Sequence, residues 1–170
     1  MEISTDIIKE LRKQCGAGIM ECRNALVNCQ GDIEKALEEL KERGYLKAAK
    51  KAERVTTQGL IEAYIHIGGR IGAMVELNCE TDFVARTDEF KELAHNLAMQ
   101  VAAMCPQFIS QEEIPPEQKA DVEVETACLL QQAYIKDPTI AVQDIIVQAI
   151  AKVGENIKVS RFARFEIGMW

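Results

Sequence analysis

The sequence lacks any apolar run near the roughly 18 residues that cross a membrane, and its first residues, MEISTDIIKE, lack the basic and apolar regions of a signal peptide. We therefore expect a soluble protein of the cytoplasm with no membrane partner. Basic residues are also scarce, because 20 Lys and Arg stand against 27 Asp and Glu, for a net charge of -7. Nucleic-acid binding depends on basic side chains that neutralise phosphates, so we expect no nucleic-acid partner.

The sequence also lacks the usual signatures of enzyme and cofactor sites. No GxxxxGK[ST] loop is present to hold phosphates, and the GGRIG segment lies between two predicted strands with no helix after it. His66 and His95 are the two histidines, and neither forms a motif with a cysteine. Zinc sites use close CxxC pairs, whereas Cys15, Cys22 and Cys29 are seven residues apart. We predict no cofactor, no metal and no catalytic residue, and interpret the cysteines as reduced packing residues.

Three short helices are predicted near the N-terminus, where apolar residues recur three or four positions apart. The repeating positions are Ile7, Ile8, Leu11 and Cys15, then Ile19, Cys22, Leu26 and Cys29, then Ile33, Leu37 and Leu40. Glycines interrupt the pattern after the first two helices, and Gly44 is expected to end the third. Helices this short need mutual packing, so we predict a bundle. The Ala- and Lys-rich residues 45–54 are expected to form a connector, which divides the chain into domains at 1–54 and 55–170.

The second domain begins with residues that alternate with a period of two, which is typical of strands. Apolar positions are Ile61, Ala63, Ile65 and Ile67, then Ile71, Ala73, Val75 and Leu77, and near the end Ile157, Val159, Ala163 and Phe165. We predict a hairpin with one buried face, joined by the last segment in a three-stranded antiparallel sheet.

Helices are expected to pack against that sheet. A broad apolar stripe over residues 88–104 predicts a helix that covers the buried face. Helical pattern resumes over residues 117–133, and a last helix is predicted over 141–153, where Gly154 stops it. The chain therefore belongs to the α+β class, with a three-helix bundle followed by a sheet packed against helices.

One segment, NCETDFVAR at residues 78–86, fits neither the strand nor the following helix. Its polar residues favour a turn. Phe83 lies within this turn and continues neither the apolar alternation of the strand before it nor the apolar stripe of the helix after it. Burial is the usual fate of an aromatic ring, and an outward-pointing binding residue is the alternative. Glu80 and Asp82 are better interpreted as solvated or capping carboxylates than as an acid–base pair.

This segment, after a hairpin with YIHIGGRIG, resembles the signature of the elongation factor Ts family. The N-terminal run LRKQCGAGIMECRNAL with GDIEKAL behind it, and the ending AKVGENIKVSRFARFEIG, are similar to the same family. The resemblance is strong over residues 3–114 and 128–168. It implies that the N-terminal bundle is ubiquitin-associated-like, and that the chain is a non-enzymatic guanine-nucleotide exchange factor for the GTPase elongation factor Tu in protein synthesis.

The resemblance also implies which residues bind elongation factor Tu. Asp82 and Phe83 dock on the GTPase domain, where the Phe83 ring acts as a wedge that displaces the elements holding Mg²⁺ and phosphate. Thr81 and Val84 on either side of them are expected to contact the same partner. Further positions that match contact or signature residues of the family are Arg12, Met20, Val153, Gly154, Glu155 and Asn156. From the residues alone, Met20 is equally well a core residue and Gly154 a helix terminator.

The chain resembles the short class of the family, with one copy of the core subdomain, and several helical turns of longer relatives are missing near residues 119–128. In that class two chains pair through their sheets, so we expect a homodimer, with a monomer as the alternative. A rival function is a ubiquitin-associated-like adaptor whose bundle alone binds a partner. A thiol enzyme that uses Cys79 is a more distant alternative.

Overall fold

The computed structural model describes residues 3–168 and divides the chain into two compact units. One unit takes in the chain up to Glu53 together with Val147–Glu155, and the other takes in Arg54–Ile146 together with the chain from Asn156 onward. The predicted helix over residues 141–153 is present as α7, Val142–Val153, and Gly154 ends it with a φ of 80°. Among residues 3–168, no helix is both long and apolar enough to cross a membrane.

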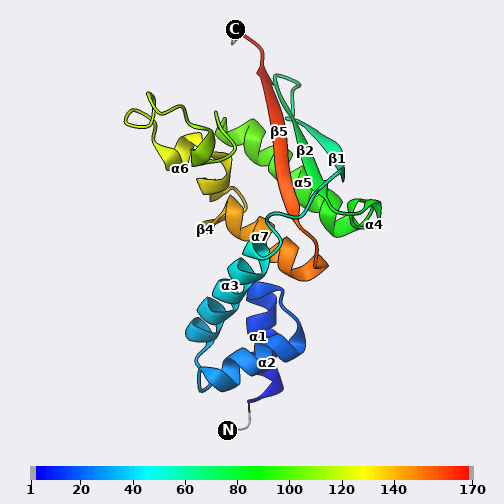
Figure 1. Cartoon of the computed structure of the whole chain (residues 1–170), viewed down its shortest axis with the longest axis vertical. Coiled ribbons are helices and arrows are strands. Elements are labelled where there is room, and N and C mark those ends of the chain that lie inside the picture. Colours follow the sequence, from blue (N-terminus) through cyan, green and yellow to red (C-terminus); the bar gives the residue numbers. More distant parts are fainter. Residues whose placement is uncertain (1–2, 169–170) are drawn as a thin grey trace. The chain divides into compact units, whose positions relative to one another are not determined.

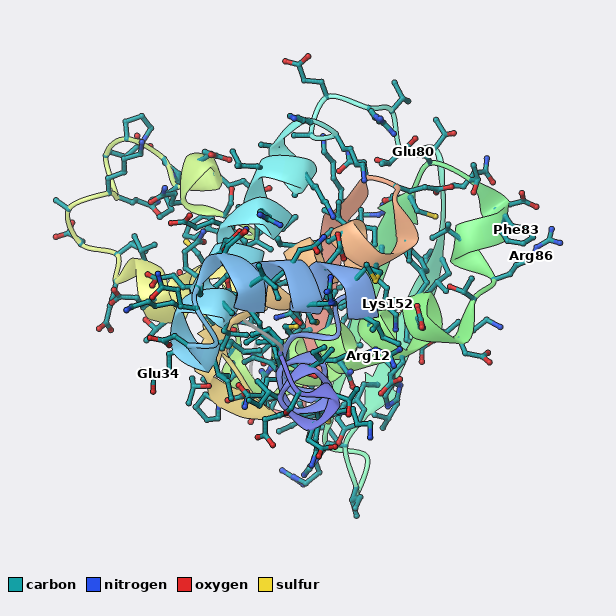
Figure 2. The ribbon with its side chains drawn as sticks, turned by 90° about the horizontal axis from the view of Figure 1, so that it is seen from below. Arg12, Glu34, Glu80, Phe83, Arg86 and Lys152 are labelled. Carbon is teal, nitrogen blue, oxygen red and sulfur yellow. The ribbon has the colours of Figure 1, made fainter. Side chains whose placement is uncertain are left out.

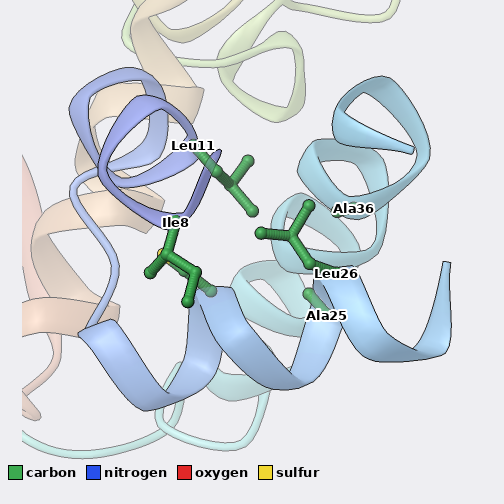
Figure 3. Packing of buried hydrophobic residues seen from close by; sticks show 6 residues of the cluster. Ile8, Leu11, Ala25, Leu26 and Ala36 are labelled. Atoms are coloured by element: carbon green, nitrogen blue, oxygen red, sulfur yellow. The ribbon is translucent and has the colours of Figure 1, made fainter. Parts of the chain in front are cut away.

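The first unit contains the predicted three-helix bundle. Its helices are α1 (Thr5–Cys15), α2 (Ile19–Asn28) and α3 (Ile33–Ala49). Ser4 caps α1 by accepting from the Ile7 N–H, and Asp32 caps α3 by accepting from the Lys35 N–H. The apolar faces meet in a common core, shown in Figure 3, whose buried members are Ile8, Leu11, Cys22, Ala25, Leu26 and Ala36.

Helix α3 does not end at Gly44 as predicted, but continues to Ala49 and reaches 17 residues. Gly44 is buried inside the helix, where a Cβ atom would lie 3.3 Å from Val147 Cγ1 in the same unit. This glycine therefore permits close packing and does not stop the helix. The residues after it are good helix formers, so the first part of the predicted connector extends α3.

The second unit contains the predicted three-stranded antiparallel sheet. Its strands are β1 (Gln58–Ile65), β2 (Ile71–Cys79) and β5 (Ile157–Glu166), in the order β1-β2-β5. The predicted helix α5 (Asp88–Met104) packs along the sheet, as Figure 1 shows. Beneath it lie the buried side chains of β2, which are Ala73, Val75, Leu77 and Cys79. The α+β architecture is confirmed.

The two hairpin strands do not share one apolar face as expected. Tyr64 pairs with Ala73 and Glu62 pairs with Val75. Paired residues of antiparallel strands point to the same face, so Ile61, Ala63 and Ile65 point away from the buried side chains of β2. The error has a simple origin, since a one-residue change of register moves every side chain of a strand to the other face.

Strand β5 changes face within its length, which the alternation did not predict. Val159 pairs with Leu77 and Arg161 pairs with Glu76, so Ser160 between them is the extra residue of a β-bulge. Ile157 and Val159 before the bulge lie on the buried face, whereas Ala163 and Phe165 after it point to the opposite face. That opposite face carries an apolar patch, which we call the open face, formed by Ile61, Ala63, Ile65, Met74, Ala163 and Phe165. The Glu76–Arg161 ion pair lies on the same side of the sheet, next to Ile61.

The prediction of a helix over residues 117–133 is wrong. The segment before α7 contains only short elements, which are the 3₁₀ turns η1 (Gln111–Glu113) and η2 (Leu129–Gln131), α6 (Val124–Ala127), and a hairpin of β3 (Ala133–Tyr134) and β4 (Asp137–Ala141). A buried amide pair holds this arrangement, because Gln100 on α5 donates to Gln132 Oε1 at 3.1 Å. Gln132 in turn donates to the Thr126 carbonyl at 2.6 Å. These long-range hydrogen bonds override local helix propensity.

Candidate functional site

The segment that follows β2 forms a tight helical turn between two threonine caps. Thr81 Oγ1 accepts from the Val84 N–H and begins the single-turn helix α4 (Asp82–Ala85). Thr87 Oγ1 donates to the Val84 carbonyl at 2.8 Å and accepts from the Phe90 N–H, which begins α5. Both ends of the turn are therefore fixed by side-chain hydrogen bonds.

This turn exposes one aromatic ring. Val84 and Ala85 point inward and are buried, whereas Phe83 is 81% exposed. Figure 2 shows Phe83 and Arg86 projecting outward from α4. Of the two outcomes that the residue pattern left open for Phe83, the structure has the outward one. Val84, another predicted contact residue, is 7% exposed.

Asp82 pairs with Arg86 on the surface of the same turn, with the carboxylate and guanidinium atoms 2.8 Å apart. Both side chains are largely exposed, so the pair contributes at most about 1 kcal/mol to stability. The Asp82 carboxylate thus stays within reach of a partner. Arg86 was not predicted from the sequence, although the four-residue spacing between Asp82 and Arg86 is typical of an ion pair on a helix.

Glu80 joins the turn to two distant parts of the second unit. Its Oε1 atom accepts from the Asn156 N–H at 2.7 Å and from Arg54 Nη1 at 3.4 Å. Asn156 is 2% exposed, and its side-chain amide donates to the Arg54 carbonyl at 3.0 Å. These three residues form a cluster, the Glu80 clasp, immediately before Thr81. No local pattern reveals it, because Glu80 and Asn156 are 76 positions apart.

Arg12 and Met20 lie in the first unit, on either side of the loop between α1 and α2. Arg12 is exposed in the last turn of α1, and its carbonyl accepts from the Gly16 N–H. Met20 is 61% exposed in the first turn of α2, so it is not a core residue. Glu21 holds that turn in place by accepting from the Gly18 N–H and from Lys47. The hydrogen bond from Lys47 lowers the pKa of the Glu21 carboxyl.

Val153 and Gly154 form the end of α7. Val153 is half-buried, and Gly154 is exposed with its N–H donating to the Ile150 carbonyl. The positive φ of Gly154 is a conformation that other residues seldom adopt, so this glycine does terminate the helix. Asn156, two residues later, belongs to the Glu80 clasp.

Cys22 and Cys128 lack the environment of a catalytic nucleophile. A reactive thiol needs a lowered pKa, whereas burial raises the pKa of Cys128 and that of Cys22. Cys79 is fully buried, and its thiol donates to the Thr81 carbonyl. Within residues 3–168, no three His, Cys, Asp or Glu side chains gather in a way that suits a metal ion.

Comparison with known proteins matches the chain to one family over most of its length. The family profile described as "Elongation factor TS" covers residues 4–125. Elongation factor Ts of Thermotoga maritima is 50% identical over 99% of this chain and 98% of its own. The protein of the same name from Heliobacterium modesticaldum is 47% identical over 98% of this chain and 90% of its own. This chain therefore belongs to the elongation factor Ts family.

Proposed function

We propose that this protein is a guanine-nucleotide exchange factor for elongation factor Tu in protein synthesis and works in the cytoplasm without enzymatic chemistry. The observation that carries the proposal is the exposed Phe83 ring on a turn that is fixed at both ends. A large aromatic ring in water is unfavourable unless a partner covers it. A ring already held in its binding position loses little entropy on association, which favours affinity.

In this mechanism Phe83 inserts into the GTPase domain and disturbs the elements that hold Mg²⁺ and phosphate. Asp82 orients the turn through its exposed carboxylate, and Thr81 and Val84 keep the ring in position. Binding of this protein to elongation factor Tu then weakens nucleotide binding, and bound nucleotide weakens binding of this protein by the same factor. Because the coupling is reciprocal, incoming GTP releases the exchange factor, and one molecule serves many GTPase molecules.

Residues of the other compact unit add contacts in this proposal. Met20 supplies an exposed apolar side chain and Arg12 an exposed charge beside the same loop. Val153 and Gly154 at the end of α7 form a further contact with elongation factor Tu. The exposure of Met20 and Gly154 supports these roles.

We also propose that two copies of the chain form a homodimer through the open face of the sheet. Ile61, Ile65 and Phe165 on this face are each more than 60% exposed. A contiguous apolar patch of this kind is typical of an interface. Pairing of two identical faces is self-complementary, as a two-fold dimer requires.

The direct test follows release of a fluorescent GDP analogue from elongation factor Tu, with this protein at stoichiometric and substoichiometric amounts. We expect faster release in both cases. Phe83→Ala should lower the stimulated rate about thirtyfold, because an anchor residue contributes about 2 kcal/mol or more to an interface. Ile67→Ala is the matched control, since Ile67 is 93% exposed at the hairpin tip and should leave release unchanged.

Unchanged GDP release with the wild-type protein would contradict the proposal. The adaptor alternative makes a different prediction, in which Met20→Ala abolishes binding to a partner while Phe83→Ala has no effect. Thermal unfolding of each variant serves as the folding control, and an exposed position such as Phe83 should leave the melting temperature nearly unchanged.

A further inference from the structure

Two cysteines of the bundle lie in direct contact. Cys15, the last residue of α1, and Cys22 on α2 have sulfur atoms 3.7 Å apart. A disulfide needs a sulfur separation of about 2.0 Å, so a small further approach would join them. The intervening Gly16–Ala17–Gly18 loop carries two glycines, and Cys22 Sγ already lies against the Ala17 carbonyl at 3.8 Å. The loop between the two helices is therefore short and rich in glycine.

The two thiols differ in their access to solvent. Cys15 is half-buried, whereas Cys22 is fully buried in the bundle core. Burial beside Cys15 raises the pKa of Cys22 to about 11, so Cys22 is a poor first target for an oxidant. Cys15 is the more accessible of the pair, and the Cys22 sulfur is close enough to attack an oxidised Cys15 sulfur.

We propose that Cys15 and Cys22 are an oxidation site at which a peroxide converts two thiols into an intramolecular disulfide. In the first step the Cys15 sulfur attacks one peroxide oxygen, the O–O bond breaks, and Cys15 becomes a sulfenic acid as hydrogen peroxide yields one water. In the second step Cys22 attacks the Cys15 sulfur, the S–O bond breaks, and a second water leaves with the Cys22 proton. Two thiols are oxidised and one peroxide is reduced to two waters.

The disulfide would tie the end of α1 to the first turns of α2. It constrains the unfolded chain more than the folded bundle, so it should stabilise the bundle, and a thiol reductant should reverse the effect. It would also stiffen the loop that leads to Met20. This inference concerns the bundle itself and holds whether or not nucleotide exchange is the function.

The experiment treats the folded full-length protein with hydrogen peroxide, blocks the remaining thiols by alkylation, and maps the peptides by mass spectrometry. The Cys105→Ser background removes the exposed thiol that would otherwise link separate chains. Trypsin releases both cysteines in one peptide, Gln14–Arg23. We expect this peptide to be two hydrogens lighter and unalkylated, and to regain both thiols with dithiothreitol.

Two comparisons make the result decisive. The same peroxide dose in urea should give a smaller fraction of the disulfide, because the folded bundle holds the sulfurs together. Oxidation should also raise the melting temperature, and Cys15→Ser and Cys22→Ser should each abolish the rise. Alkylated Cys15 and Cys22, a stably overoxidised Cys15, or equal disulfide yield in folded and unfolded protein would overturn the proposal.

Discussion

Glu80 separates a buried strand from an exposed aromatic turn, and one of its oxygen atoms accepts from both Asn156 and Arg54. A residue in this place can control where the turn begins. Asn156 is 2% exposed and its N–H donates to Glu80, as is usual for a buried polar group. At the scale of single residues, we therefore expect the orientation of Phe83 to depend in part on neighbours that are remote in sequence.

We predict that Glu80→Ala will reduce stability and weaken nucleotide exchange. Glu80→Ala removes a hydrogen bond from Asn156 to a charged group, which is worth about 1.5–3 kcal/mol. Glu80→Gln keeps a side-chain carbonyl that can accept from Asn156, so it should recover most of the exchange rate. Chemical denaturation and GDP release measured on both variants check this. Equal exchange by wild type and Glu80→Ala would show that the clasp does not position the turn.

At the scale of elements, two features of the sheet decide which residues face outward. The register of β1 against β2 turns Ile61 and Ile65 away from α5, and the bulge at Ser160 turns Phe165 to the same side. Gly59 allows β1 to approach β2 closely, because a Cβ atom there would lie 2.2 Å from the Leu77 carbonyl oxygen. Its φ of 149° is also uncommon for other residues.

Gly59→Ala should therefore destabilise the second unit more than Gly68→Ala does. Gly68 also has a positive φ, of 93°, but a Cβ atom there would meet nothing within 4 Å. We expect about 1 kcal/mol for the strain at Gly68, and more than about 2 kcal/mol at Gly59, where backbone must also move. Urea denaturation of the two variants compares these values. Equal losses would mean that β1 shifts freely away from β2.

At the scale of the whole molecule, the open face leaves Ile61, Ile65 and Phe165 exposed to solvent. We predict that Phe165→Glu disrupts the homodimer, because it places one charge from each copy in an apolar interface. The dimer dissociation constant should rise at least about a hundredfold, which corresponds to roughly 2.7 kcal/mol. Sedimentation equilibrium over a range of protein concentrations measures it.

Val55→Glu provides the control for the dimer experiment. Val55 is 75% exposed but does not belong to the open face, so the same substitution there should leave the dimer intact. A wild-type protein that sediments as a monomer at every concentration would contradict the homodimer. If the wild type is a dimer and Phe165→Glu is a monomer, GDP release by the variant reports whether exchange depends on the second copy.

The sequence by itself determined the features that depend on near neighbours. The periodicity of the helices and the alternation in the strands act over four residues or fewer, so each can be recognised locally. The odd position of Phe83 in NCETDFVAR was also visible, although residues alone favoured its burial. Resemblance to the family, confirmed by the comparisons, supplied the functional meaning of that segment.

Only the tertiary structure decided the features that depend on distant partners. Strand register set the facing of Ile61, and the buried Gln100–Gln132 pair replaced a predicted helix with short turns. Gly44 lies within α3, close to Val147, a neighbour that its sequence surroundings do not reveal. Asn156 reached Glu80 across 76 positions, next to the turn that exposes Phe83. Such contacts join residues that are far apart in the sequence, so no local pattern around either residue predicts them.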